Sequence, residues 1–213
     1  GSGNIREGLR KALKLLKEAG WSFKGEKLVN DKTGQPFEFE FLLDNPQFER
    51  IVLPFANNLK RMGITARVRT VDTAQYQRRM EIFDYDMTVV LFGESLSPGN
   101  EQREYFGSKA ADQQGSGNLL GVNSKVVDQL IEELIQAPDR ASLVAQTRAY
   151  DRVLQYGYYV IPNYHLSAFR VAYWNKFRRP ATSPKYALGL DTWWVDPAAE
   201  HSVEAKKGEV TKK

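Results

Sequence analysis

The sequence predicts an α/β fold with a mixed, mostly parallel sheet flanked by helices. Between residues 28 and 92, strand-like segments alternate with amphipathic helical segments, the order typical of parallel strands joined by right-handed crossovers. Hydrophobic residues make up 42% of the chain and aromatic residues 12%, a composition that favours a folded core over disorder. The 213 residues are enough for one large domain, or for one domain and a return segment.

The N-terminal part predicts a helix followed by a hairpin. Apolar residues recur at helical spacing over residues 5–19, with Asn4 as the expected N-cap and Gly20 as the residue that follows the helix. A hairpin is expected over residues 28–43, with a turn at 30–35. Its second strand alternates phenylalanine with glutamate, which places the two residue types on opposite faces.

The next segments complete the strand and helix alternation. Asn45 opens a helix that Gly63 ends, and a strand is expected over residues 64–71. Asp72 then caps a short helix. The strand expected at residues 85–92, YDMTVVLF, is apolar on both faces and ends at Gly93. We therefore expect it to be central in the sheet and covered on both sides.

Two longer helices are predicted in the second half of the chain. Residues 124–137 form the first, and Asp139 caps the second, which runs to residue 157. The side chains expected to face inward are Val126, Val127, Leu130, Ile131, Leu134, Leu143, Tyr150, Val153 and Leu154.

The remaining segments predict less regular structure. The glycines and polar residues of residues 107–118 indicate a flexible loop without a phosphate-binding arrangement. Two extended segments are expected at residues 158–165 and 168–174. The charged residues 204–213 indicate a disordered end.

Composition excludes several classes of protein. The chain has no cysteine, which excludes disulfides and thiolate chemistry. Its two histidines are far apart in sequence, so no metal site is expected, and no nucleotide-cofactor motif is present. No apolar run approaches 18 residues, so no membrane span is expected.

Three sets of residues have alternative interpretations. Glu38 and Glu40 could form a catalytic acid–base pair, but strand alternation explains them as a solvated face. His165 could be a general base or a structural or hinge histidine, and we expect the latter. The net charge is +4 with acids and bases interspersed. An autonomous basic α/β module that binds nucleic acid or a protein partner is therefore an alternative function, although solvated faces explain the first four of its candidate residues equally well. Its candidate residues are Arg67, Arg69, Arg78, Arg79, Lys176, Arg178 and Arg179.

The polar loop GESLSPGN carries the candidate binding residues. Ligands of open α/β sheets lie beyond the carboxyl ends of the strands, which is where Glu94, Ser95, Leu96 and Ser97 follow the apolar strand. A lone carboxylate there suits an ammonium or other cationic group, and exposed backbone suits an extended peptide. Alternatively, Glu94 only caps the loop.

The order of motifs resembles the C-terminal lobe of extracytoplasmic solute-binding proteins of peptide ABC importers. The motifs are LRKALKLLKEAGW, NNLKRMGITARVRTVD, FDYDMTVVLF and a helical stretch that runs from NSKVVDQLI to YYVIPNYH, together covering residues 5–165. SLSPGNEQREYFGSKAAD further resembles the branch that imports oligopeptides and the peptide–nucleotide antibiotic microcin C.

This resemblance implies one lobe of a two-lobed periplasmic-binding-protein fold of type II. It implies a substrate-binding lobe at residues 1–168, a hinge and return segment at 169–195 that completes the missing lobe, and a flexible tail at 196–213. The resemblance also implies a periplasmic location, no catalysis and no cofactor. The implied partners are an oligopeptide ligand, the N-terminal portion of the same receptor and the membrane subunits of an ABC importer, with no nucleic acid.

The resemblance also implies roles for individual residues. In peptide-binding relatives an acidic residue shortly after the YD strand pairs with the peptide α-amino group, and Glu94 stands in the matching place, four residues before Pro98. The loop differs from the aspartate-rich form of those relatives. Secondary candidates for lining the cleft are Phe92, Asn118, Asn163, Tyr164 and Trp174.

Overall fold

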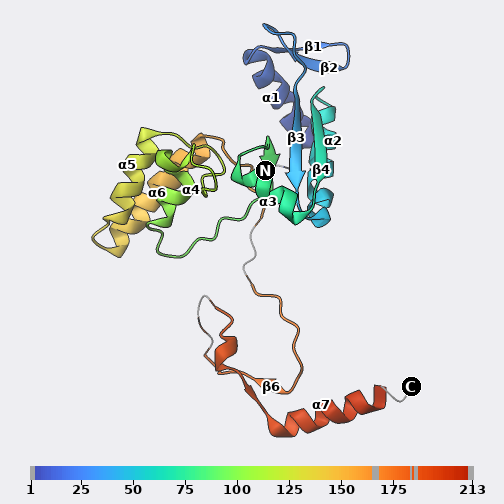
Figure 1. The fold of residues 1–213 in the computed structure, drawn as a ribbon, viewed down its shortest axis with the longest axis vertical. Coiled ribbons are helices and arrows are strands. Elements are labelled where there is room, and N and C mark those ends of the chain that lie inside the picture. The colour runs from blue at the N-terminus through green and yellow to red at the C-terminus, as the bar shows by residue number, and fades with distance from the viewer. Residues whose placement is uncertain (1–2, 165–167, 183, 185–186, 211–213) are drawn as a thin grey trace. The chain divides into compact units, whose positions relative to one another are not determined.

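The computed structural model describes residues 3–164, 168–182, 184 and 187–210, which form two units, residues 1–160 and 161–213. The first unit begins with helix α1 (Ile5–Glu18) (Figure 1). The Asn4 side chain accepts a hydrogen bond from the Glu7 backbone N–H at 3.2 Å, and Gly20 follows the helix with a φ of 84°. Both predicted helix ends are therefore confirmed.

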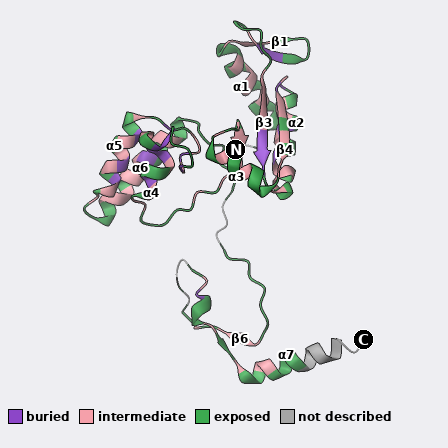
Figure 2. Ribbon diagram, in the orientation of Figure 1, coloured by how far each residue is buried: buried purple, intermediate pink, exposed green. Residues whose placement is uncertain are grey.

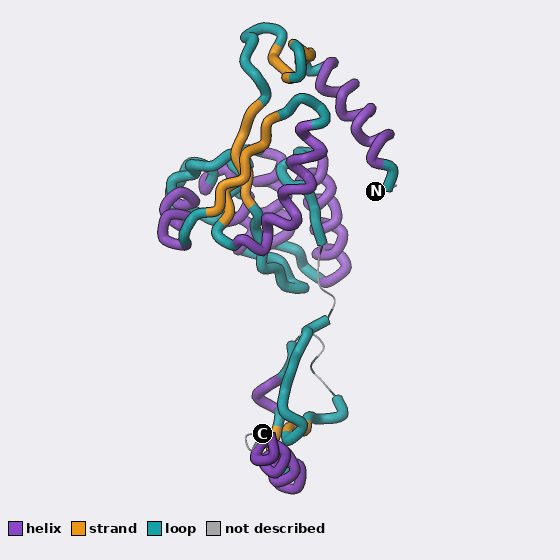
Figure 3. Tube along the Cα trace, turned by 90° about the vertical axis from the view of Figure 1, so that its right-hand side faces the viewer, coloured by secondary structure: helices purple, strands orange, loops and turns teal. Residues whose placement is uncertain are grey.

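The central feature of this unit is a parallel sheet with the strand order β4-β3-β5. Its strands are β3 (Glu38–Leu43), β4 (Thr65–Thr70) and β5 (Met87–Thr88). The first crossover contains the 3₁₀ turn η1 (Pro46–Phe48) and helix α2 (Glu49–Lys60), and the second contains helix α3 (Thr73–Glu81). Figure 3 shows the strands side by side, with helices packed along them. The predicted parallel α/β arrangement is thus confirmed.

The prediction of a central strand over residues 85–92 is wrong, because β5 contains only two residues and lies at the edge beside β3. Side chains take over the hydrogen bonding next to this short ladder. The Asp86 carboxylate accepts a hydrogen bond from the Glu40 backbone N–H at 2.8 Å, and the Thr88 hydroxyl donates to the Leu42 carbonyl at 2.8 Å. Residues 89–92, the rest of the predicted strand, form no strand, and Leu91 is 93% exposed.

The predicted hairpin is only partly correct. Strand β2 (Lys27–Asn30) pairs along its length with β1 (Trp21–Lys24), a strand that the sequence analysis missed. Between β2 and the chain before β3 there is one isolated bridge, Val29 to Pro36. The reason is the tight turn at Gly25, whose φ of 63° suits glycine.

A helical cluster follows the sheet. It consists of α4 (Glu101–Phe106), the 3₁₀ turn η2 (Ser108–Ala110), α5 (Lys125–Ile135) and α6 (Arg140–Tyr156). Ser124 and Asp139 cap α5 and α6 with their side chains, as expected for Asp139. Figure 2 shows buried residues on the facing sides of these helices. The buried core contains Phe106, Val122, Val127, Ile131, Leu134 and Tyr150.

Two predictions about this cluster need correction. Val126 is 57% exposed rather than inward-facing, because the buried face of α5 passes through Val127, Ile131 and Leu134. Residues 107–118 are not a plain loop: they contain η2, and four of their side chains are buried. These are Ala110, Ala111, Ser116 and Asn118.

The second unit contains short elements. They are the antiparallel pair β6 (Phe177–Arg178) and β7 (Trp194–Val195), the 3₁₀ turn η3 (Leu190–Thr192) and helix α7 (Pro197–Val210). The described parts of residues 158–165 and 168–174 form no strand, and His165 lies outside the described residues. Helix α7 occupies the segment where a flexible tail is predicted. The division into lobe, return segment and tail stays a prediction.

Candidate functional site

Aromatic packing fixes the start of the loop that carries the candidate residues. The Phe92 ring lies 5.5 Å from the Tyr105 ring and 5.2 Å from the Phe106 ring, measured between centroids. The Phe106 ring in turn lies 6.0 Å from the Tyr150 ring of α6. Edge-to-face and tilted contacts of this kind stabilise aromatic cores. The loop is therefore anchored on α4 and, through α4, on α6.

An ion pair fixes α4 against α5. The Arg103 guanidinium donates from Nε and Nη2 to the two oxygens of Glu132, both at 2.6 Å. This bidentate geometry is the strongest form of an arginine–carboxylate pair. Both side chains are about half exposed, so the pair mainly orients the helix.

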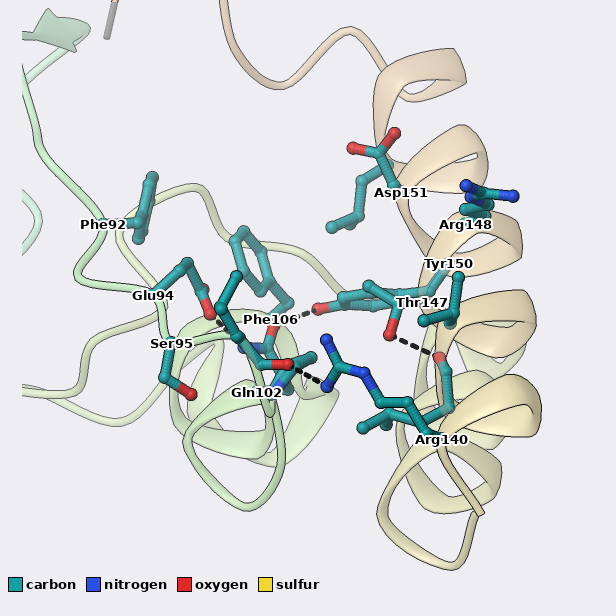
Figure 4. A pocket seen from close by; sticks show the side chains of 15 residues that line it. Phe92, Glu94, Ser95, Gln102, Phe106, Arg140, Thr147, Arg148, Tyr150 and Asp151 are labelled. Atoms are coloured by element: carbon teal, nitrogen blue, oxygen red, sulfur yellow. Dashed lines mark hydrogen bonds between the residues drawn. The ribbon is translucent and has the colours of Figure 1, made fainter. Parts of the chain in front are cut away.

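A cavity of about 440 Å³ lies between the loop at residues 92–98 and helices α4 and α6. Figure 4 shows Glu94 and Ser95 on the loop side of this pocket and Arg140, Thr147 and Asp151 on α6. Much of the remaining wall is apolar and consists of Phe92, Leu96, Pro98, Phe106, Leu143, Val144 and Leu154. The pocket combines an apolar wall with a few charged groups, the composition expected of a ligand site.

Gln102 links the pocket carboxylate to the helical core. Its Nε2 donates to Glu94 Oε2 at 2.8 Å and lies 3.3 Å from Glu101 Oε1. Its Oε1 accepts a hydrogen bond from the Tyr150 hydroxyl at 3.1 Å. Gln102 and Tyr150 are buried, at 2% and 4% exposure. Their hydrogen bonds are therefore made where an unpaired polar group would be costly.

The pKa values of the two carboxyl groups beside Gln102 are shifted in opposite directions. Burial raises the pKa of Glu94, the hydrogen bond from Gln102 opposes this in part, and the charge of Glu101 adds to the increase. Burial also acts to raise the pKa of Glu101, but hydrogen bonds, including one from the Gly99 backbone N–H at 2.8 Å, lower it overall. Glu94 therefore takes up a proton before Glu101 as the pH falls.

Arg140 closes one side of the pocket. Its guanidinium donates a hydrogen bond to the Leu96 carbonyl, which joins the first turn of α6 to the loop. Inside the loop the Ser97 backbone N–H donates to the Ser95 hydroxyl at 3.0 Å. The loop backbone is thus held at both its start and its middle.

The structure brings together four of the nine predicted site residues. Phe92, Glu94, Ser95 and Leu96 line the pocket, whereas Ser97 lies in the same loop but does not line it. Asn163, Tyr164 and Trp174 belong to the second unit, and their role stays a prediction.

The prediction that Asn118 lines a cleft is wrong for this pocket. Its side chain is fully buried, donates from Nδ2 to the carbonyls of Gly107 and Val122, and accepts from the Val122 backbone N–H. These bonds hold residues 107–122 together, so Asn118 is structural.

The sequence analysis missed Gln102 and the pocket face of α6, including Arg140, Thr147 and Asp151. Tyr150 was expected only as an inward-facing residue. The inward spacing of Gln102 and Phe106, four residues apart on one helix face, is the pattern that could have revealed a buried polar side chain.

Ion pairs explain Glu38 and Glu40 and most of the basic residues that were considered as a nucleic-acid surface. Glu38 pairs with Lys27 at 3.2 Å and with Arg67 at 2.5 Å, and Glu40 pairs with Arg79 at 2.9 Å. Because each carboxylate already has a cationic partner, the two do not form an acid–base pair. Of the seven basic candidates for a nucleic-acid surface, five form ion pairs with carboxylates: Arg67, Arg78, Arg79, Lys176 and Arg178.

In the part of the chain that the structure describes, no helix is both long and apolar enough to cross a membrane. Within the same residues, no three acidic or histidine side chains gather in a way that could hold a metal ion.

A parallel α/β sheet with flanking helices and a ligand-sized pocket is the architecture expected of one lobe of the type II periplasmic-binding-protein fold. Residues 3–114 match the family model described as the middle region of bacterial extracellular solute-binding proteins, family 5. The chain belongs to this family. Since the family consists of binding proteins, the prediction that the chain is not an enzyme is confirmed.

Curated relatives extend the match over most of the chain. An uncharacterised protein y4wM of Sinorhizobium fredii is 54% identical over 92% of this chain and 30% of its own length. The probable peptide-binding protein YejA of Agrobacterium fabrum is 47% identical over 91% of this chain and 32% of its own length. The chain therefore spans about a third of the length of these relatives.

Solved structures share the fold. The oligopeptide-binding protein AppA of Bacillus subtilis, in complex with a nonapeptide, superimposes with a TM-score of 0.68 and 20% identity. The match covers 88% of this chain and 37% of AppA. The predicted fold class and family resemblance are confirmed.

Proposed function

We propose that this chain is the ligand-binding C-terminal portion of a periplasmic receptor that captures oligopeptides and delivers them to an ABC importer. The observation that carries the proposal is the Glu94 carboxylate, held at the wall of a 440 Å³ pocket. A carboxylate beside an apolar wall suits the ammonium group and first side chain of a peptide. The names of YejA and AppA, which refer to peptide binding, support this ligand class.

The exposed surface of the second unit supports the proposal that the N-terminal portion of the receptor is a partner of this chain. Of its described residues only Gly189 is buried. Large apolar side chains between residues 161 and 174 are exposed, including Ile161, Tyr164, Phe169, Tyr173 and Trp174. Exposed apolar surface of this extent favours burial against another protein surface. We therefore propose that residues 169–195 complete the other lobe and that the receptor closes around its ligand.

Isothermal titration tests the proposal with a short peptide that has a free N-terminal amine and with its N-acetylated form. The receptor assembled from this chain and the N-terminal portion should bind the free peptide, and the chain alone should bind it weakly or not at all, since half of the contacts are missing. Equal affinity of the chain alone and the assembled receptor would contradict the two-lobe part of the proposal.

The Glu94→Gln variant tests the site itself. It should weaken binding of the free peptide about tenfold or more, because a charge-assisted hydrogen bond is lost, and leave the acetylated peptide unaffected. Glu133→Gln on α5, an exposed carboxylate outside the pocket, is the matched control. If free and acetylated peptides bind wild type and Glu94→Gln alike, Glu94 is only a loop cap.

The cargo within the peptide class is a narrower proposal. The stretch SLSPGNEQREYFGSKAAD supports peptide–nucleotide conjugates such as microcin C as candidates. A relative 41% identical, YepA of Agrobacterium fabrum, is named for peptidoglycan binding, so peptidoglycan-derived peptides belong in the same titration. The ligand with the highest affinity identifies the cargo.

A further inference from the structure

A chain of hydrogen bonds with one direction runs from the helical core to the pocket. Carboxylates can only accept hydrogen bonds, so the Gln102 amide must turn its NH₂ group toward Glu94 and Glu101. Its carbonyl oxygen then faces Tyr150, whose hydroxyl must donate to it. The direction of every bond is therefore fixed by the acceptor-only carboxylates at one end.

The Tyr150 hydroxyl keeps its proton. Burial raises the pKa of Tyr150, and the charges of Glu94 and Glu101 raise it further. The hydroxyl thus stays protonated and remains a donor over the range in which proteins are folded. The buried ring also packs against Phe106 at 6.0 Å, which restricts its movement.

This arrangement leaves one oxygen of Glu94 available. Oε2 accepts the hydrogen bond from Gln102, whereas Oε1 has no hydrogen bond to any described residue. The charged groups around it are Glu101, the first residue of α4, and Arg140, Arg148 and Asp151 on α6. Arg140 is engaged with the Leu96 carbonyl, and Asp151 accepts a hydrogen bond from Gln155 at 2.6 Å.

We propose that Gln102 and Tyr150 are positioning residues that hold the Glu94 carboxylate in the orientation needed to bind a ligand ammonium group through Oε1. The proposal rests on the proposed function. The proposal explains ligand specificity, because a carboxylate oxygen held in one orientation favours a primary ammonium donor on the ligand over a neutral amide of similar size. Gln102 and Tyr150 need not touch the ligand amine themselves.

The Tyr150→Phe variant removes the hydroxyl that donates the first hydrogen bond of the series and keeps the aromatic ring. The Gln102 amide then has a buried oxygen without a donor and is free to turn, which weakens its hold on Glu94. Affinity of the assembled receptor for the free-amine peptide should fall about fivefold. Tyr156→Phe is the matched control, since Tyr156 lies on the same helix and is 83% exposed.

A second measurement works on the chain itself and does not require peptide binding. The pKa of Glu94 can be followed through the carboxyl carbon in an NMR titration. The hydrogen bond from Gln102 lowers this pKa, so its loosening in Tyr150→Phe should raise the pKa. Gln102→Met, which removes the amide at similar volume, should raise it as well, and Tyr156→Phe should leave it unchanged.

The outcomes separate the inference from the proposed function. If wild type does not distinguish free from acetylated peptide, the proposed function fails. If it does, but Tyr150→Phe binds both peptides as Tyr156→Phe does, the positioning role is overturned. An unchanged Glu94 pKa in Tyr150→Phe also overturns it, whether or not peptides bind.

Discussion

Arg79 on α3 and Glu40 on β3 form a close ion pair, with Arg79 Nη1 2.9 Å from Glu40 Oε1. The Arg79 Nε also donates to the Asp84 carboxylate at 2.8 Å and to its carbonyl at 2.9 Å. The Arg79 side chain is only 15% exposed. It therefore ties the second crossover helix to the middle strand and to the turn that leads into β5.

We predict that Arg79→Leu lowers the free energy of unfolding by about 2 kcal/mol, because the partly buried Glu40 carboxylate loses its donor and the exposed Asp84 loses its link to α3. Urea denaturation of the chain measures the change. Arg78→Leu is the control on the same helix: its side chain is 73% exposed and its pair with Glu81 spans 3.7 Å. It should change stability by no more than about 0.5 kcal/mol. Equal effects of the two variants would contradict the anchoring role of Arg79.

Gly63 is required where α2 meets the hairpin of β1 and β2. Its φ is 75°, and a Cβ there would lie 2.6 Å from the Leu28 backbone nitrogen. Gly63→Ala should therefore destabilise the chain by clearly more than the 1–2 kcal/mol or so expected from a left-handed residue alone. Gly20→Ala measures the cost of the left-handed conformation alone, since Gly20 has a φ of 84° and open space around it. The difference in melting temperature between the variants measures the clash.

The sequence predicted most of the helices because their determinants are local. Caps such as Asn4, Asp72 and Asp139 and the spacing of apolar residues lie within each segment. The extent of β5 was predicted wrongly because it depends on partners far along the chain, namely the backbone of Glu40 and Leu42. An apolar run alone does not reveal which of its residues pair.

Substitution of Asn118 tests whether this residue has a structural role or contacts the ligand. Asn118→Ala removes three buried hydrogen bonds and leaves the groups of Gly107 and Val122 without these partners. We expect a loss of about 3 kcal/mol in the free energy of unfolding, measured by urea denaturation. The exposed Asn123 is the control, and Asn123→Ala should have little effect. A stable Asn118→Ala chain would contradict the structural role.

The candidate site could be predicted only where the sequence places residues in one loop. Glu94, Ser95 and Leu96 follow an apolar segment, and that position identified them. Gln102 and Arg140 join them through hydrogen bonds to Glu94 and to the Leu96 carbonyl, and these partners on another element cannot be read from the local sequence. Asn118 was misassigned because a polar residue in a glycine-rich segment resembles a surface residue, although its amide replaces backbone partners in the interior.

The last prediction concerns pH. Burial raises the pKa of Glu94, so its carboxylate is neutralised at a higher pH than an ordinary glutamate. A neutral carboxyl group does not attract an ammonium, so affinity for a free-amine peptide should decrease as the pH falls through this raised pKa. At the upper end affinity should decrease again as the peptide amine, with a pKa of about 8, loses its proton.

Titrations of the assembled receptor from about pH 4 to about pH 8 measure this profile. The acetylated peptide and the Glu94→Gln variant should both lack the acidic decrease, because neither retains the ammonium–carboxylate pair. The acidic midpoint for the free peptide should lie above the ordinary pKa of a glutamic acid, about 4.3, when extrapolated to the ligand-free receptor. A midpoint at or below that value would show that burial does not control the charge of Glu94.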